Sequence, residues 1–338
     1  MAISQLPTEV TGVVVEKFGD WHNAKLGMLP LRALRNGEVL LRCEGAALNF
    51  QDLLMIEGKY QYKPSLPFVP GSDVAGTIIA CGPDVKTFAI GQRVAALVQS
   101  GAFANYSIAR LDRMFPLPNN IDMAKAAAAT SIFATVVVAL TIRGQLKAGE
   151  RILITGAAGG VGIAAVQYAR QIGAEVIALI SSEHKQKLAQ RAGAQHVLRL
   201  DRMSHPKEDL KAALAGLNID GVDVVTDMVG GDVFDGAIRC LRSGGRMVVV
   251  GFASGRIAEV KTNYVLLKSI SVVGSALKMG LEEHGPLLAK LMDGVYADIA
   301  SETLDPYITG RYPFADFHQA AKQIADRSAA GKIVLVPP

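Results

Sequence analysis

The stretch from residue 151 to residue 182, RILITGAAGGVGIAAVQYARQIGAEVIALISS, constrains the fold of this chain most strongly. An apolar run is followed by a glycine-rich turn, a segment of helical periodicity and a second apolar run. This order predicts a βαβ unit in which a diphosphate approaches the turn and the unpaired N–H groups of the helix N-terminus. The spacing is G-x-x-G-x-x-G, so a tight turn with packing glycines is the alternative. The residues assigned to the diphosphate are Gly156, Gly159, Gly160, Val161 and Gly162.

Alternating helix and strand patterns continue from residue 183 to residue 274. They predict a parallel sheet covered by helices on both faces. Before this region, residues 12–118 contain short strand-like runs, with a long irregular stretch over 49–71 that is expected to line a site. After it, a helix is predicted over 312–324, and the last strand, 332–336, is expected to return to the first domain. The fold class is therefore α/β, with a doubly wound parallel sheet and a mostly β domain.

Composition indicates a globular chain with two domains. Of its 338 residues, 50% are hydrophobic and 20% are charged, and the net charge of +4 is spread without a basic block. Nucleic acid is therefore not an expected partner. Cys43, Cys81 and Cys240 are far apart and odd in number, which indicates buried thiols in a reducing compartment, not a disulfide set, and predicts a cytoplasmic protein. No signal-peptide pattern is seen, and the uncharged run 126–142 is interpreted as a buried helix, so no membrane association is expected.

Several motifs together resemble the zinc-independent quinone oxidoreductase branch of the medium-chain dehydrogenase/reductase superfamily, which includes the zeta-crystallins. They are ALNFQDLLMIEGKYQYKPSLPFVPGSDVAGTI (47–78), GQRVAAL (91–97), GAFANYSIA (101–109), ITGAAGGVG (154–162), VVVGFASG (248–255) and AGKIVLVP (330–337). The resemblance covers nearly the whole chain. It implies a GroES-like catalytic domain over 1–124 and 275–338, with a Rossmann domain for the nucleotide inserted over 125–274.

Zinc-dependent relatives carry a ligand cysteine before the long loop and a His-Glu pair after the Pro-Gly turn. Here those positions read AALN (46–49) and SD (72–73), and the four-cysteine lobe is missing. A site with no thiolate or imidazole does not suit a catalytic zinc ion, so the predicted chemistry uses no metal.

The nucleotide is predicted from the end of the second apolar run. In NAD-specific sheets an Asp or Glu binds the ribose hydroxyls here, whereas this chain has Ser181 and Ser182, followed by Lys185. Hydroxyls and an ammonium accommodate a 2′-phosphate that a carboxylate would repel, so NADPH is the predicted cofactor. Relatives that use NADPH often carry a Tyr where this chain has Leu200, and Arg199 is a candidate to compensate. The alternative for Lys185 is a solvated helix residue.

The resemblance also assigns further cofactor contacts. They are Asn49 and Thr135 near the nicotinamide, Phe252, Ser254 and Gly255 in a loop over the cofactor, and Arg327 near the phosphates. Each has a structural alternative. Asn49 suits a turn, Thr135 can bond its own helix backbone, and Arg327 can serve as a helix C-terminal charge.

Hydride transfer without a metal needs a positioned acceptor and a donor for the developing oxyanion. Tyr60 is the candidate donor, because enoyl-thioester reductases resemble this chain at Gly58-Lys59-Tyr60; an aromatic packing role is the alternative. Asp52 is shared with the branch but also suits a helix cap, and Asn49 completes the predicted catalytic set. The expected acceptor is a quinone or an enone.

Other functions and an assembly follow from the same resemblance. An enoyl-thioester or 2-alkenal reductase of the same superfamily is the runner-up, and a non-catalytic NADPH-binding protein is a third interpretation. The short apolar strand over 270–274 is expected at a sheet edge, where the branch commonly dimerises, so a homodimer is predicted.

Overall fold

The computed structural model describes residues 6–326 and 328–337, which form two compact units. Unit 1 lies within Met1–Ser131 and Ala289–Pro338, and unit 2 is Ile132–Leu288. Two helices continue across the unit boundaries, α2 (Met123–Val136) and α8 (Leu277–Ala300). The predicted domain bounds, 124/125 and 274/275, fall near the beginnings of these helices, and the domain assignment stays a prediction.

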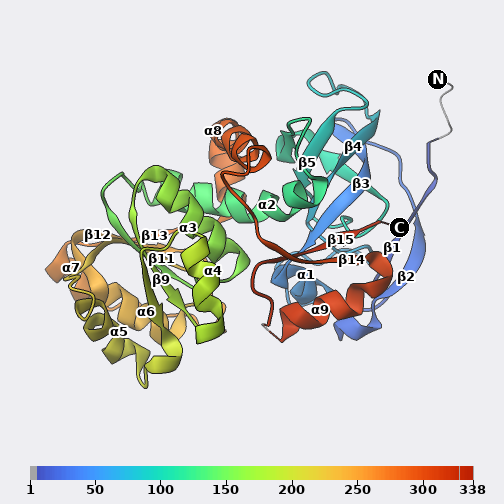
Figure 1. The fold of residues 1–338 in the computed structure, drawn as a ribbon. Coiled ribbons are helices and arrows are strands. Elements are labelled where there is room, and N and C mark those ends of the chain that lie inside the picture. The colour runs from blue at the N-terminus through green and yellow to red at the C-terminus, as the bar shows by residue number, and fades with distance from the viewer. Residues whose placement is uncertain (1–5, 327, 338) are drawn as a thin grey trace. The chain divides into compact units, whose positions relative to one another are not determined.

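Unit 2 is a parallel sheet with helices packed on it (Figure 1). Its strands lie in the order β10-β9-β8-β11-β12-β13 among the described residues. This is the doubly wound order, which reverses between β8 and β11, and the predicted α/β class is confirmed. The elements are β8 (Arg151–Thr155), α3 (Gly160–Ile172), β9 (Glu175–Ile180), α4 (Gln186–Arg191), β10 (His196–Arg199), α5 (Pro206–Ala215), β11 (Val222–Asp227), α6 (Gly231–Cys240), β12 (Leu241–Val249), α7 (Thr262–Lys268) and β13 (Ser271–Gly274).

Unit 1 contains a mostly antiparallel sheet in the order β14-β15-β3-β4-β5-β7, with β6 paired to β3, and a ribbon of β1 and β2 (Figure 1). Ile333 of β15 pairs antiparallel with Leu48 of β3, so the last strand returns to the first domain as predicted. The elements are β1 (Glu9–Val14), β2 (Lys25–Pro30), β3 (Glu38–Leu48), α1 (Phe50–Ile56), β4 (Asp73–Cys81), β5 (Arg93–Leu97), β6 (Tyr106–Arg110), β7 (Met114–Pro116), β14 (Ile308–Pro313), α9 (Phe317–Ala325) and β15 (Lys332–Val336).

Two segments differ from the sequence predictions. The stretch predicted as irregular contains helix α1, whose first turn is held by a hydrogen bond from the Asn49 N–H to the Asp52 carboxylate at 2.8 Å. Seven residues are too few to show helical periodicity in a sequence. The helix predicted from residue 312 begins at Phe317, because Tyr312 and Pro313 pair with β15 as the end of β14.

The uncharged run forms one long helix, α2 continued by a π-helical segment, η3 (Val137–Arg143). Among the described residues, Met123–Arg143 is long and apolar enough to cross a membrane by length and composition, and 72% of its most apolar window is buried in the protein. The helix is therefore mostly a core element, as the sequence predicts.

Candidate active site and cofactor-binding site

A buried polar cluster lies in unit 1 where β3, β4 and β15 meet. It consists of Asn49, Asp52, Asp73, Ser131 and Lys332. The Asn49 side chain donates from Nδ2 to Asp73 Oδ2 at 2.9 Å, and its Oδ1 accepts from Lys332 Nζ. Ser131 Oγ donates to the same Asp73 oxygen. The Asn49 amide therefore lies between an ammonium and a carboxylate, which fixes its orientation.

The ionisable side chains of this cluster are buried. Asp52 and Asp73 are fully buried and Lys332 is 3% exposed. Burial raises the pKa of Asp52 to about 7 and also raises that of Asp73, where the nearby Lys332 opposes the rise. Burial likewise lowers the pKa of Lys332. Among the described residues, Asp73 Oδ1 has no hydrogen-bond partner, so this oxygen can still accept a hydrogen bond.

Tyr60 is connected to this cluster by hydrogen bonds that we call the donor chain: Tyr60, Gln51, Ser72 and Asp52. The Tyr60 hydroxyl donates to Gln51 Oε1 at 3.2 Å, and Gln51 Nε2 donates to Ser72 Oγ at 2.7 Å. The Ser72 hydroxyl then donates to Asp52 Oδ1 at 3.0 Å. Burial and the nearby Asp52 raise the pKa of Tyr60, so its hydroxyl keeps its proton and can act as a hydrogen-bond donor.

A zinc ion does not fit this donor set. The side chains offer carboxylate, amide and hydroxyl oxygens, and the cation among them is the Lys332 ammonium, bonded to Asn49 Oδ1 and to the Leu48 carbonyl at 3.4 Å. In the described ranges, no three His, Cys, Asp or Glu side chains are grouped to hold a metal ion. Catalytic zinc sites instead use Cys and His ligands with an open position.

The predicted diphosphate residues lie together at the start of α3 in unit 2. Gly159 is the N-cap of α3 and has no side chain with which to cap the helix, which leaves the first N–H groups accessible to a ligand. Gly156 has a φ of 64°. A Cβ on Gly162 would lie 2.1 Å from the Gly156 carbonyl oxygen, so the turn closes only with glycine there. This surface fits a dinucleotide diphosphate.

Loops that follow neighbouring strands brace this turn. Thr155 at the end of β8 donates to the Asp227 carboxylate at 2.7 Å, and that carboxylate also accepts from the Gly230 N–H at 3.0 Å. The predicted cofactor loop is attached to the same segment, because the Ser254 N–H donates to the Val229 carbonyl at 2.8 Å. Phe252 is 45% exposed, and the Gly255 N–H closes a turn on its carbonyl.

The end of β9 carries the predicted 2′-phosphate residues. Ser182 Oγ lies 3.1 Å from His184 Nδ1 and 3.5 Å from Ser181 Oγ. Burial lowers the pKa of Lys185, which is half-buried. Arg199, at the end of β10, is held by Glu183 at 2.8 Å and by Asp201 at 2.9 Å. Three of its five N–H donors are engaged by these two carboxylates, whose negative charges also oppose the approach of a phosphate.

The predicted site residues thus fall into separate groups. Asn49, Asp52 and Tyr60 are joined by hydrogen bonds in unit 1, and the glycines, the serines and the 252–255 loop lie at the carboxyl edge of the sheet in unit 2. Thr135 is half-buried on α2. Arg327 lies outside the described residues.

The sequence did not reveal the residues that orient Asn49, Asp52 and Tyr60 through hydrogen bonds. They are Gln51, Ser72, Asp73, Ser131 and Lys332. Gln51 and Asp73 lie inside the motif 47–78, and Lys332 lies inside AGKIVLVP. A lysine within an apolar strand is a signal that could have found Lys332, because a buried charge requires partners.

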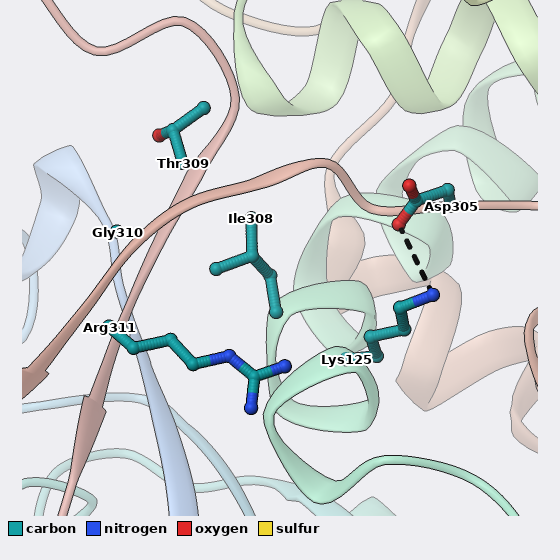
Figure 2. Close-up of a pocket in the computed structure, with 6 residues that line it drawn as sticks. All are labelled: Lys125, Asp305, Ile308, Thr309, Gly310 and Arg311. Carbon is teal, nitrogen blue, oxygen red and sulfur yellow. Dashed lines mark ion pairs between the residues drawn. The ribbon is translucent and has the colours of Figure 1, made fainter.

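A surface hollow of about 350 Å³ lies elsewhere in unit 1, beside α2 and β14 (Figure 2). Its lining includes Lys125, which pairs with Asp305 at 3.9 Å, and Arg311, which pairs with Asp122 at 2.8 Å. The lining contains none of the predicted site residues, so the hollow does not identify the active site.

Two family profiles match this chain, and each covers a different part of it. Residues 35–119 match the family profile of the alcohol dehydrogenase GroES-like domain, and residues 160–293 match that of zinc-binding dehydrogenases. The predicted GroES-like domain is confirmed.

Full-length relatives and solved structures are similar as well. The chain is 33% identical over 306 residues to quinone oxidoreductase-like protein 2 of Bos taurus, covering 90% of this chain and 86% of that protein. It is 31% identical over 330 residues to a quinone oxidoreductase of Sus scrofa, covering 97% and 98% of the two chains. A mycobacterial protein solved in complex with NADPH has a TM-score of 0.87 at 28% identity, covering 97% of this chain and 100% of that one.

Proposed function

Because the chain belongs to the quinone oxidoreductase branch of the medium-chain dehydrogenase/reductase superfamily, we propose that it is an NADPH-dependent oxidoreductase that passes hydride to a quinone or a related electron-poor acceptor without a metal. The observation that carries this proposal is the buried polar cluster with its donor chain, which supplies a neutral hydroxyl donor and an internal ammonium where a metal enzyme needs thiolate and imidazole ligands.

Tyr60 is the residue that we assign to the acceptor. Its raised pKa keeps the hydroxyl protonated near neutral pH, so it can donate to the oxygen on which negative charge develops. Asn49 is assigned to the cofactor's carboxamide. Its Nδ2 is engaged by Asp73 and by the Ala47 carbonyl at 3.3 Å, which leaves a lone pair on Oδ1 to accept one hydrogen bond.

The cofactor supplies the hydride when it is bound. Gly156 to Gly162 and the N-terminus of α3 would hold its diphosphate, and Ser181, Ser182 and Lys185 would hold the 2′-phosphate. Support for NADPH comes from these residues and from the mycobacterial structural relative that was solved with NADPH. Thr135, the 252–255 loop and Arg327 stay proposed contacts.

Activity with purified protein tests this function. We expect NADPH oxidation with 1,4-naphthoquinone to be faster than with a crotonyl thioester, with one NADPH and one proton consumed per hydroquinone formed. Tyr60→Phe should lower kcat/KM by about 100-fold, the typical loss when one oxyanion donor is removed. Tyr312→Phe, which alters a tyrosine hydroxyl bonded to Gln323 instead, is the matched control.

Two alternatives give different results in the same assay. A faster reaction with the thioester would identify an enoyl-thioester reductase, which the Gly58-Lys59-Tyr60 motif supports. Binding of NADPH without turnover of any quinone, enone or thioester would leave a non-catalytic NADPH-binding protein and would remove the proposed activity.

Independence from metal is part of the proposal. Since the cluster contains no Cys or His ligand, we expect that treatment with a chelator leaves kcat unchanged and that elemental analysis of the purified protein finds no stoichiometric zinc. Loss of activity on chelation with recovery on addition of Zn²⁺ would contradict it. A cytoplasmic location and a homodimer complete the proposal.

A further inference from the structure

We propose that the protonation state of Asp52 sets the direction of the donor chain, and so decides whether the Tyr60 hydroxyl donates inward to Gln51 or outward to an acceptor. Gln51 and Ser72 are then positioning residues for Tyr60. The inference rests on the proposed function only in naming a reducible acceptor as the group that receives the outward hydrogen bond.

With Asp52 ionised, every hydrogen bond in the donor chain points inward. Both Asp52 oxygens accept, Oδ2 from the Asn49 N–H at 2.8 Å and Oδ1 from Ser72 at 3.0 Å. Gln51 accordingly presents its NH₂ group to Ser72 and its oxygen to Tyr60. The Tyr60 hydrogen is thereby committed to Gln51 and is not offered to a ligand.

With Asp52 protonated, the new hydrogen has one position. The Asn49 N–H is a fixed donor and keeps Oδ2 as an acceptor, so the proton resides on Oδ1 and points to Ser72. If the Gln51 amide kept its orientation, the Ser72 oxygen would accept twice and its own hydrogen would lose its acceptor. Ser72 is 6% exposed, so that loss is costly.

Rotation of the Gln51 amide removes this conflict. Its oxygen then accepts from Ser72 and its NH₂ group donates to the Tyr60 oxygen, so that every member of the donor chain keeps a partner. The Tyr60 hydrogen is released from Gln51 and can point to an acceptor oxygen. No covalent bond forms or breaks along the donor chain, and only the Asp52 proton is exchanged with solvent.

The charged groups around Asp52 place the change near neutral pH. Desolvation raises the pKa of this carboxyl to about 7, Asp73 on β4 adds to the rise, and Lys332 on β15 opposes it. Asp73 bonds to Asn49 and Ser131 and is not a member of the donor chain. Tyr60 itself stays protonated over this range, since its pKa is raised.

Nuclear magnetic resonance of the cofactor-free, full-length protein tests the coupling without activity. With ¹³Cζ-labelled tyrosine, the Tyr60 signal should move between about pH 6 and about pH 8, because a group of pKa near 7 goes from about 90% to about 10% protonated over that range. Tyr60→Phe assigns the signal, and Tyr312 serves as an internal reference. Asp52→Asn should abolish the movement, and Gln51→Met should leave only the smaller part that the Asp52 charge causes through space.

The two variants separate a donor chain from a charge effect. In Gln51→Met, Asp52 still ionises but has no hydrogen-bonded path to Tyr60. If the Tyr60 signal still moved with wild-type amplitude in that variant, or did not move in the wild type, the inference would be overturned. Ser72→Ala should behave like Gln51→Met, and Ser72→Thr, which keeps a hydroxyl, should restore the movement.

Kinetics give the functional consequence. In the wild type, kcat/KM should be about tenfold higher near pH 6 than near pH 8, following the protonated fraction of Asp52. Asparagine at this position donates permanently to Ser72, so Asp52→Asn should flatten this ratio relative to the exposed control Asp112→Asn. Complete inactivity of Asp52→Asn at both pH values would identify an obligatory acid and overturn the inference. Absence of turnover in the wild type would instead contradict the proposed function. The nuclear magnetic resonance experiment would still decide whether Asp52 sets the direction of the donor chain.

Discussion

At Asp52, an ionisable side chain lies where water does not reach, and this makes stability depend on pH. The folded-state pKa is about 7 against an ordinary value of 3.8, so the folded protein keeps a proton that the unfolded chain has already released. The free energy of unfolding therefore falls as pH rises from about 4 to about 7, by up to about 4 kcal/mol from this group. We expect the Tm of Asp52→Asn minus the Tm of the wild type, measured by thermal unfolding, to increase as pH rises. A difference in Tm that is constant with pH would contradict this, and Asp112→Asn is the exposed control.

We expect a few side chains at and just after the end of β9 to decide the cofactor preference. A charge-assisted contact between Lys185 and a 2′-phosphate is worth roughly 1.5–3 kcal/mol, about ten- to over a hundredfold in affinity. Lys185→Ala should therefore weaken NADPH by that factor and leave NADH nearly unchanged, and Ser181→Asp should invert the preference. The measurement is kcat/KM for both cofactors, with the exposed Lys187→Ala as control. Equal weakening of both cofactors by Lys185→Ala would mean that Lys185 does not contact the 2′-phosphate.

At the level of single residues, the sequence reveals the members of a motif but not the distant partners that orient them. Asn49, Asp52 and Tyr60 lie in one motif, and the structure joins them by hydrogen bonds, while their roles stay predictions. The partners that orient Asn49 could not be identified from the sequence, because Lys332 is 283 positions away and meets it only through the pairing of β15 with β3. The sequence offers Arg199 as a contact for a phosphate. The structure shows it bonded to Glu183 and Asp201, so these carboxylates compete with a phosphate for its guanidinium, which its charge alone does not reveal.

Among the elements, those with a strong local pattern could be predicted and short ones could not. The unit β8-α3-β9 combines two apolar runs with a glycine turn, and each signal is complete within a few residues. Helix α1 has seven residues, too few to show helical periodicity, although the local contact between Asn49 and Asp52 fixes its first turn. The strand β14 owes its conformation to pairing with β15, which no local pattern encodes.

The packing of α3 against its own turn gives a prediction about that element. Gly162→Ala places a methyl group against the Gly156 carbonyl, so the helix must shift away from the turn. We expect both NADPH and NADH to bind more weakly by similar factors, with a lower Tm. Gly294→Ala is the matched control, since a Cβ there meets nothing within 4 Å and alanine favours a helix by about 1 kcal/mol. Unchanged binding of both cofactors would exclude a diphosphate at this turn.

At the scale of the whole molecule, the edge of the unit 2 sheet leads to a prediction of the oligomeric state. Strand β13 pairs with β12 on one side, and Leu266, Leu267 and Val272 nearby are 79%, 77% and 37% exposed. An apolar edge of this kind offers a template for pairing with a second copy, so we expect a homodimer by light scattering at micromolar concentration. Val272→Lys should shift the protein toward monomer, whereas Met28→Lys, at an exposed residue of unit 1, should not. A monomeric wild type would contradict the prediction.

The pairing of β15 with β3 also sets an order of events during synthesis. The ribosome releases β3 long before β15, whereas all the strands of the unit 2 sheet lie within Ile132–Leu288 and can pair as soon as that segment has emerged. Lys332 reaches Asn49 only after it has itself emerged, 283 positions later in the chain. The nucleotide-binding unit can therefore fold on the growing chain before Lys332 is made. A product terminated before Lys332 would present the proposed cofactor surface, whereas Asn49 would lack its ammonium partner.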